Sequence, residues 1–428
     1  MSPEKTKNPG AGSNPWFDGA GAPAFPIREM QQALCGEGLD GWLFCNFRHR
    51  DRISDEILGI DPETTNSRLW LYVVPARGEP LGIVHAIEKD GLRTGGKALP
   101  GAVVSYRSRA ELLERLRPFA GKRWGAHFSE AITAISFLDA GTAALLERAG
   151  LSLVSAEGLL QRFKGLLDPA GIEAHEKAAG HLYEIVRLCW DRVRKSYAER
   201  EAICEGDIQE LMLEEFGKRN LVTDHARIVA AGKNSANPHY DIPEEAAGRA
   251  RRGERFAEGD VIQFDLWARD PGPGGIYADI SWVGVYAEQP APHLEKAFAG
   301  LVEAREGALR FIGEELEAGR RPAGADIDRR TREILAGAGF EEALRHRTGH
   351  GIDTEVHGSG VNIDSVEFPD TRLLLDGACF SLEPGIYFPS AKETAGGAFG
   401  MRTEIDVYIK DGKPVVSGDT PQFVLLHC

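Results

Sequence analysis

The stretch "DVIQFDLWARDPGPGGIYADISWVGVY", residues 260–286, decides the fold of the second half of this 428-residue chain. Two apolar runs flank a turn rich in glycine and proline, which predicts two strands joined as a hairpin. Each run is interrupted by one acidic residue, Asp265 in the first and Asp279 in the second. A bare carboxylate in a buried strand is costly unless it is paired or binds a cation. Paired strands can bring both onto one face, where they repel unless a metal lies between them.

Three further motifs add side chains of the same kind. "FSLEPGIYF" places Glu383 after an apolar strand, and "MRTEIDVYI" places Glu404 inside one. "RTGHGIDTEVHG" sets His350 and His357 beside glycines, which suggests that something approaches the backbone closely. Each residue alone is better explained as a salt bridge or an ordinary histidine. Taken together, four carboxylates and an imidazole predict a site for a pair of divalent cations such as manganese, cobalt, iron or zinc.

The alternation of predicted elements divides the chain into three parts. Residues 1–25 are rich in Gly, Pro, Ser and Asn and predict a flexible arm. Residues 26–165 alternate helices with strands, which predicts an α/β domain. Residues 166–428 place helix pairs between strand pairs, which predicts an α+β domain. Its first helix should start at Asp168 as the N-cap with Pro169 at the first helical position.

Composition restricts the class of protein. The formal charge of −15 (50 basic against 65 acidic residues) disfavours nucleic acid or an anionic membrane as a partner. The six cysteines are scattered without a CxxC pair, which indicates reduced thiols inside a cell. No apolar run reaches membrane-spanning length, and the N-terminus lacks the features of a signal peptide. We therefore expect a cytoplasmic protein.

The order "FD", "YADIS", "GHGI", "LEPGIY", "RTE" resembles the metallopeptidases of the pita-bread fold, peptidase family M24. That family includes methionine aminopeptidase, Xaa-Pro aminopeptidase, prolidase and the metal-free creatine amidinohydrolase. The resemblance covers residues 165–428, and the first domain is similar to the N-terminal domain of the prolidase and Xaa-Pro aminopeptidase branch. It implies a creatinase/prolidase-like α/β domain followed by an α+β pita-bread catalytic domain.

The resemblance implies a role for each matching residue. Asp265 would bind one metal, Asp279 and Glu404 would bridge two metals, and His350 and Glu383 would complete the second site. A hydroxide bridging the two cations would attack the peptide bond, with Glu383 as its general base.

Five more residues take roles around the substrate or the metal ligands by the same resemblance. His357 would hydrogen-bond the substrate and the developing oxyanion. His239, in "NSANPHYD", would contact the substrate near its leaving side. Arg402 would either pair with a ligand carboxylate or hold the substrate, and Tyr387 would contact the substrate or support the site. Asp406 would orient a ligand.

The implied activity is hydrolysis of the N-terminal Xaa-Pro bond of dipeptides or short peptides, by a homodimer with two divalent metal ions (Mn, Co or Zn) per subunit. A metal-free amidinohydrolase like creatinase is the first alternative, and a non-catalytic binding protein on the same fold is the second. Members of both groups have lost metal ligands, whereas all five ligand positions are intact here. The segment "HGSG" that begins at His357 departs from the family pattern, since many relatives have Glu after this histidine, and the departure falls on the substrate-facing wall of the pocket.

Overall fold

The computed structural model of the chain describes residues 25–225, 227–243, 252–272, 274–390 and 397–428. The arm predicted for residues 1–25 therefore lies almost entirely outside the described residues. The chain forms two compact units, one ending at Lys164 and one beginning at Gly165. We describe each unit by itself. Among the described residues, no helix combines the length and apolar character needed to cross a bilayer.

The first unit is an α/β fold around a six-stranded mixed sheet in the order β6-β3-β2-β1-β7-β8. Alternation along its central strand assigns the two faces. Trp42 and Phe44 pack with α1, α2 and α5, whereas Leu43 packs with α3 and α4. The helices are α1 (Ile27–Gly36), α2 (Arg52–Leu58), α3 (Arg109–Leu116), α4 (Ala140–Arg148) and α5 (Glu157–Phe163), with short 3-10 turns η1 (Arg117–Phe119) and η2 (Thr133–Ile135). The strands are β1 (Gly41–Asn46), β2 (Trp70–Pro75), β3 (Leu81–His85), β6 (Ala102–Tyr106), β7 (Arg123–Ala126) and β8 (Ser152–Ser155), with a small hairpin of β4 (Arg93–Thr94) and β5 (Lys97–Ala98).

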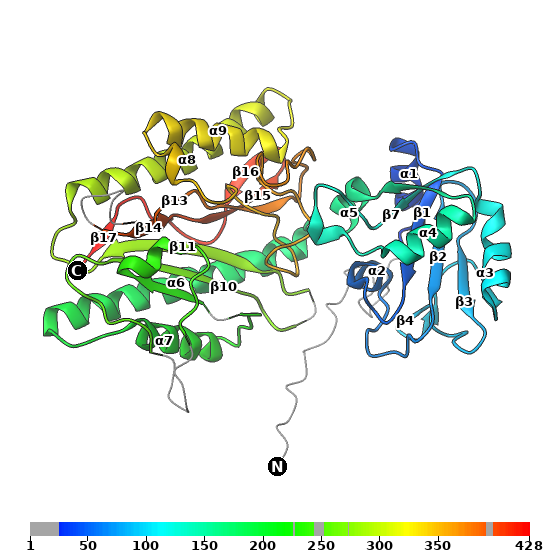
Figure 1. The fold of residues 1–428 in the computed structure, drawn as a ribbon, viewed down its shortest axis with the longest axis horizontal. Helices are drawn as coiled ribbons and strands as arrows, with labels where there is room; N and C mark the ends of the chain where they lie inside the picture. The colour runs from blue at the N-terminus through cyan, green and yellow to red at the C-terminus, as the bar shows by residue number, and fades with distance from the viewer. Residues whose placement is uncertain (1–24, 226, 244–251, 273, 391–396) are drawn as a thin grey trace, which may run out of the picture. The chain divides into compact units, whose positions relative to one another are not determined.

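The second unit places curved strands between two pairs of helices (Figure 1). Its helices are α6 (Pro169–Glu199), α7 (Glu205–Lys218), α8 (Pro292–Glu317) and α9 (Gly324–Gly337), with 3-10 turns η3 (Gly232–Ala236) and η4 (Glu341–Ala343). Its strands are β9 (Ile228–Ala231), β10 (Val261–Ala268), β11 (Ala278–Val285), β12 (Cys379–Leu382), β13 (Gly385–Phe388), β14 (Phe399–Arg402), β15 (Ile405–Lys410), β16 (Lys413–Val416) and β17 (Leu426–His427). They form sheets β17-β11-β10-β9, β12-β15-β16 and β13-β14. This arrangement of helix pairs and strand pairs confirms the predicted α+β architecture.

The long helix α6 begins as the sequence predicts. The Asp168 side chain caps it by accepting a hydrogen bond from the Gly171 backbone N–H, and Pro169 occupies the first helical position. Pro is tolerated there because that backbone N–H would have no partner within the helix. The helix ends at Glu199, and the next residue, Arg200, caps it with a left-handed φ of 55° that stops the helical hydrogen bonds.

The β10–β11 hairpin separates apolar and acidic side chains. In its antiparallel register Asp265 lies opposite Ser281, and Asp279 lies opposite Trp267. Successive side chains of a strand point to opposite faces. Phe264 and Ile280 therefore join the core under α6 and α7, while Asp265, Asp279 and Ser281 point together to the other face. The register therefore places the two aspartates on one face of the hairpin, as predicted.

One prediction about the backbone is wrong. Glu404 does not lie inside a strand, because β14 ends at Arg402 and β15 begins at Ile405. The chain changes partner at this point: β14 pairs with β13, whereas β15 pairs with β12. The Glu404 backbone N–H meanwhile bonds to the carbonyl oxygen of Ser281 at 3.2 Å, which draws the break towards β11. The interruption carries the Glu404 side chain to the acidic face of the hairpin.

Candidate metal centre

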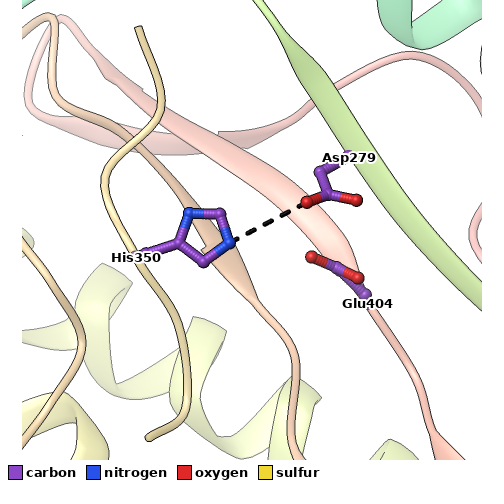
Figure 2. Close-up of side chains that lie close together, drawn as sticks. All are labelled: Asp279, His350 and Glu404. Carbon is purple, nitrogen blue, oxygen red and sulfur yellow. Dashed lines mark ion pairs between the residues drawn. The ribbon is translucent and has the colours of Figure 1, made fainter. Parts of the chain in front are cut away.

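Three predicted ligands lie together in a buried cluster. One donor atom each from Asp279, His350 and Glu404 lies within 4.8 Å of the other two. Figure 2 shows the imidazole of His350 facing both carboxylates, with its Nε2 3.8 Å from Asp279 Oδ2. One oxygen of each carboxylate, Asp279 Oδ1 and Glu404 Oε1, is buried without a hydrogen-bond partner among the described residues. Buried carboxylate oxygens without hydrogen-bond partners fit the coordination of a cation, which such oxygens bind.

The other two predicted ligands border this cluster. Glu383, just past β12, places Oε1 3.4 Å from His350 Nε2. Asp265, on β10, is held on one side by Arg402 Nη2 and on the other by Ser281 Oγ, 3.0 Å from its Oδ1. The structure therefore gathers all five residues, with Asp265 engaged by the guanidinium of Arg402.

The charges of the cluster do not balance. Asp265, Asp279, Glu383 and Glu404 are four buried carboxylates, and Arg402 is the guanidinium that the described ion pairs place among them. Burial, followed by repulsion from Glu404, raises the pKa of Asp279 well above its ordinary range. Burial and then repulsion from Glu383 raise the pKa of Glu404 well above its ordinary range. Burial also raises the pKa of Glu383 to about 7. Bound divalent cations would relieve these costs.

The imidazoles of the site favour the neutral form. Burial lowers the pKa of His350 well below its usual value, and the nearby His357 adds to the effect. The two rings meet edge to face with centroids 4.4 Å apart. His357 keeps a solvent-accessible side, yet desolvation and then the charge of Arg347 lower its pKa to about 4. A neutral imidazole is the form that binds a metal.

The glycines of the "GHG" segment are explained by close backbone contacts. A Cβ on Gly349 would lie 2.0 Å from the carbonyl oxygen of Ser381, and one on Gly351 would lie 2.6 Å from the carbonyl carbon of Gly360. Any side chain at either position would push His350 away from β12. The absence of side chains at Gly349 and Gly351 therefore allows His350 to pack against β12, the strand that leads to Glu383.

The residues predicted to contact substrate differ in their exposure to solvent. His239 is exposed on the segment after η3, and its charge contributes to the lowered pKa of His357. Arg402 is buried and pairs with Asp265, the first of its two predicted roles. Tyr387 is fully buried, and its hydroxyl lies 2.9 Å from Nε2 of His346. Because its side chain is fully buried, Tyr387 does not contact substrate in this structure, and it supports the site instead.

Sequence reasoning missed Ser281, which is fully buried at the centre of the site. Its Oγ lies 2.7 Å from Glu404 Oε2 and accepts a hydrogen bond from Arg402 Nε at 3.0 Å. The sequence spacing could have predicted this position, since Ser281 lies two residues after Asp279 and therefore shares the same face of β11. Asp406, predicted to orient a ligand, accepts a hydrogen bond from the backbone N–H of Asp279 at 2.7 Å.

The chain belongs to metallopeptidase family M24, whose model matches residues 173–411. This confirms the predicted family and the prediction of a metallo-exopeptidase. The probable dipeptidase PepE of Mycobacterium tuberculosis is 25% identical over 375 residues, which cover 85% of this chain and 86% of that protein. The Xaa-Pro dipeptidase of Lactobacillus delbrueckii subsp. lactis is 29% identical over 227 residues, 53% of this chain and 52% of that one.

Solved structures confirm the predicted fold. A prolidase from Thermococcus sibiricus superposes with a TM-score of 0.62 at 22% identity, covering 94% of this chain and 98% of that one. The N-terminal domain of the FACT complex subunit SPT16 from chickpea gives a TM-score of 0.65 at 12% identity, covering 94% and 96%. Since these two proteins share the fold under different descriptions, the fold does not define the activity. The residues of the site must do so.

Proposed function

We propose that this protein is a dinuclear metal-dependent exopeptidase that hydrolyses the N-terminal Xaa-Pro bond of dipeptides or short peptides. The observation that carries the proposal is the excess of buried carboxylates around one neutral imidazole, the donor set that divalent cations prefer. Relatives described as a dipeptidase and as an Xaa-Pro dipeptidase support the substrate class.

Two divalent cations would be held by Asp265, Asp279, His350, Glu383 and Glu404, with manganese, cobalt and zinc as the candidates. When bound, they would supply Lewis acidity that polarises the scissile carbonyl and acidifies water. In this proposal Glu383 accepts a proton from the attacking water and returns it to the leaving nitrogen. Its Oε1 lies 3.4 Å from His350 Nε2, which places this carboxylate at the edge of the proposed metal cluster, where such a water would lie.

The histidines outside the ligand set would act on the substrate. His357, whose ring stays neutral at pH 7, donates a hydrogen bond to the carbonyl oxygen as negative charge develops. His239 contacts the peptide near its leaving side. Arg402 keeps Asp265 in place and carries one positive charge into the cluster.

The two alternative functions do not account for the residues of the site. A metal-free amidinohydrolase or a binding protein would have no need for five intact ligand residues or for their unpartnered oxygens. The test is hydrolysis of Ala-Pro and Ala-Pro-Ala by protein treated with chelator and then reloaded with manganese, cobalt or zinc, with Ala-Ala and creatine as control substrates. We expect cleavage of the Xaa-Pro substrates that disappears with chelator and returns with metal. Full turnover by verifiably metal-free protein would refute the proposal, and so would hydrolysis of creatine alone.

We further propose a cytoplasmic homodimer. The described cysteines are all free thiols, which suits a reducing compartment. The homodimer rests on the predicted resemblance, and light scattering at micromolar concentration tests it. A monomer at that concentration would refute it.

A further inference from the structure

Glu205, the first residue of α7, is a fully buried carboxylate that no role above uses. Four donors surround it. Its Oε1 accepts hydrogen bonds from the backbone N–H of Ala231 and the side chain of Asn234, both at 2.9 Å. Its Oε2 accepts from the hydroxyl of Tyr240 and the backbone N–H of Glu254, both at 2.8 Å. A buried charge with four donors is stabilised, and it holds every donor in place.

Three of the four donors belong to one segment, residues 231–240, which also carries His239. Asn234 lies before this histidine and Tyr240 directly after it. The segment is tied on another side as well, because the backbone N–H of Gly400 in β14 donates to Ser235 Oγ at 3.0 Å. The segment is therefore fixed between α7 and β14.

His239 itself contributes little to this anchoring. Its backbone N–H bonds to Asn237 Oδ1 at 3.1 Å, and its ring has no hydrogen-bond partner within the described part of the chain. A free ring suits contact with substrate. Its position must then be set by neighbouring residues, because a catalytic or binding group is effective only when its support is rigid.

We propose that Glu205 is a positioning residue that holds the 231–240 segment so that His239 faces the peptide substrate, an inference that rests on the proposed function. The carboxylate is required because each of its oxygens receives two donors. A glutamine would turn an amide NH₂, itself a donor, towards one of these pairs. Location at the N-terminus of α7 also favours a negative charge there.

The experiment is a double-mutant cycle between Glu205→Gln and His239→Ala in the metal-loaded enzyme, with Ala-Pro as substrate. We expect Glu205→Gln to lower kcat/KM by about 10- to 100-fold, mainly through KM, with metal content unchanged. In the His239→Ala background the same change should cost less than about threefold further, because its effect passes through that histidine. Tyr240→Phe removes one donor and should give a smaller loss in the same direction.

Asp364→Asn is the matched control. Asp364 is also fully buried, and it accepts hydrogen bonds from the backbone N–H groups of Val366, Glu367 and Phe368. Its effect on kcat/KM should be the same with and without His239. Equal losses from Glu205→Gln in both backgrounds would overturn the inference.

Hydrogen exchange of residues 231–240 separates this inference from the proposed function. Glu205→Gln should raise backbone exchange in that segment, whereas Asp364→Asn should not. Unchanged exchange would overturn the inference even if the enzyme cleaves Xaa-Pro peptides. A wild-type protein without peptidase activity would instead refute the proposed function.

Discussion

Replacement of Ser281 by alanine tests how the carboxylates of the site are held. The hydroxyl lies 3.0 Å from Asp265 Oδ1 and 2.7 Å from Glu404 Oε2, and it accepts a hydrogen bond from Arg402 Nε. Since a serine has one hydroxyl proton, it donates to one carboxylate at a time. The substitution therefore removes one donated and one accepted bond, both to charged groups, without removing a ligand.

The expected magnitude follows from these bonds. A hydrogen bond to a charged group contributes about 1.5–3 kcal/mol, and a free-energy difference of about 1.4 kcal/mol is a factor of ten in affinity. Only the donated bond is made to a carboxylate of the proposed ligand set, so Ser281→Ala should weaken metal binding by the worth of one such bond, about 10- to 100-fold, the range also typical of groups that orient metal ligands. The protein should remain folded, because Arg402 still pairs with Asp265.

The assay is equilibrium dialysis of metal-free protein against Mn²⁺, followed by measurement of bound metal. Ser196→Ala is the control, since Ser196 is also fully buried but bonds to the backbone carbonyl of Val193 at 2.7 Å. It should bind metal as the wild type does. Wild-type affinity in Ser281→Ala, or an equal loss in both variants, would refute the reasoning.

Three further predictions concern the same centre. His350→Ala should lose metal and activity together because it removes the imidazole of the cluster, whereas His357→Ala should keep its metal and lose kcat by about 100-fold; equal metal loss in the two variants would contradict these roles. Burial raises the pKa of Glu383 to about 7, so protons compete with cations below that value. Metal affinity measured by titration calorimetry should then fall from about pH 8 to about pH 6, with proton release on binding, and a constant affinity would be contrary evidence. Gly349→Ala would place a Cβ 2.0 Å from a β12 carbonyl oxygen and should lower the free energy of unfolding by about 1–3 kcal/mol, as judged by urea denaturation. Gly180→Ala, which meets open space within α6, should lose no stability, and equal losses would show that the close contact is not the cause.

Local patterns were enough to predict much of the fold and several of the side chains that the structure gathers at the candidate metal centre. The two apolar runs and the turn of residues 260–286 predicted the β10–β11 hairpin, and the acidic interruption in each run predicted the shared face of Asp265 and Asp279. The Asp-Pro pair at 168–169 predicted the start of α6. These features depend on neighbours in sequence, so periodicity and capping rules reach them.

Features that depend on distant partners were not predictable in this way. The break between β14 and β15 follows from pairing with two different strands, which the sequence "MRTEIDVYI" does not reveal. Nothing in the sequence distinguishes Glu205 from other acidic residues in the first turn of a helix. Its partners come from residues 231–254, and the sequence gives no sign that they meet around it.

The long sequence separation within the site has a consequence for biosynthesis. Arg402 and its partner Asp265 are 137 residues apart, and Ser281 and Glu404 are 123 apart. A chain emerging from the ribosome carries both aspartates long before Glu404 is made, so a nascent chain has only part of the ligand set. Closing such long loops is slow. In the proposed metalloenzyme, cations would therefore bind only after these distant segments have come together, and the unfinished chain must keep its acidic strands soluble without bound metal.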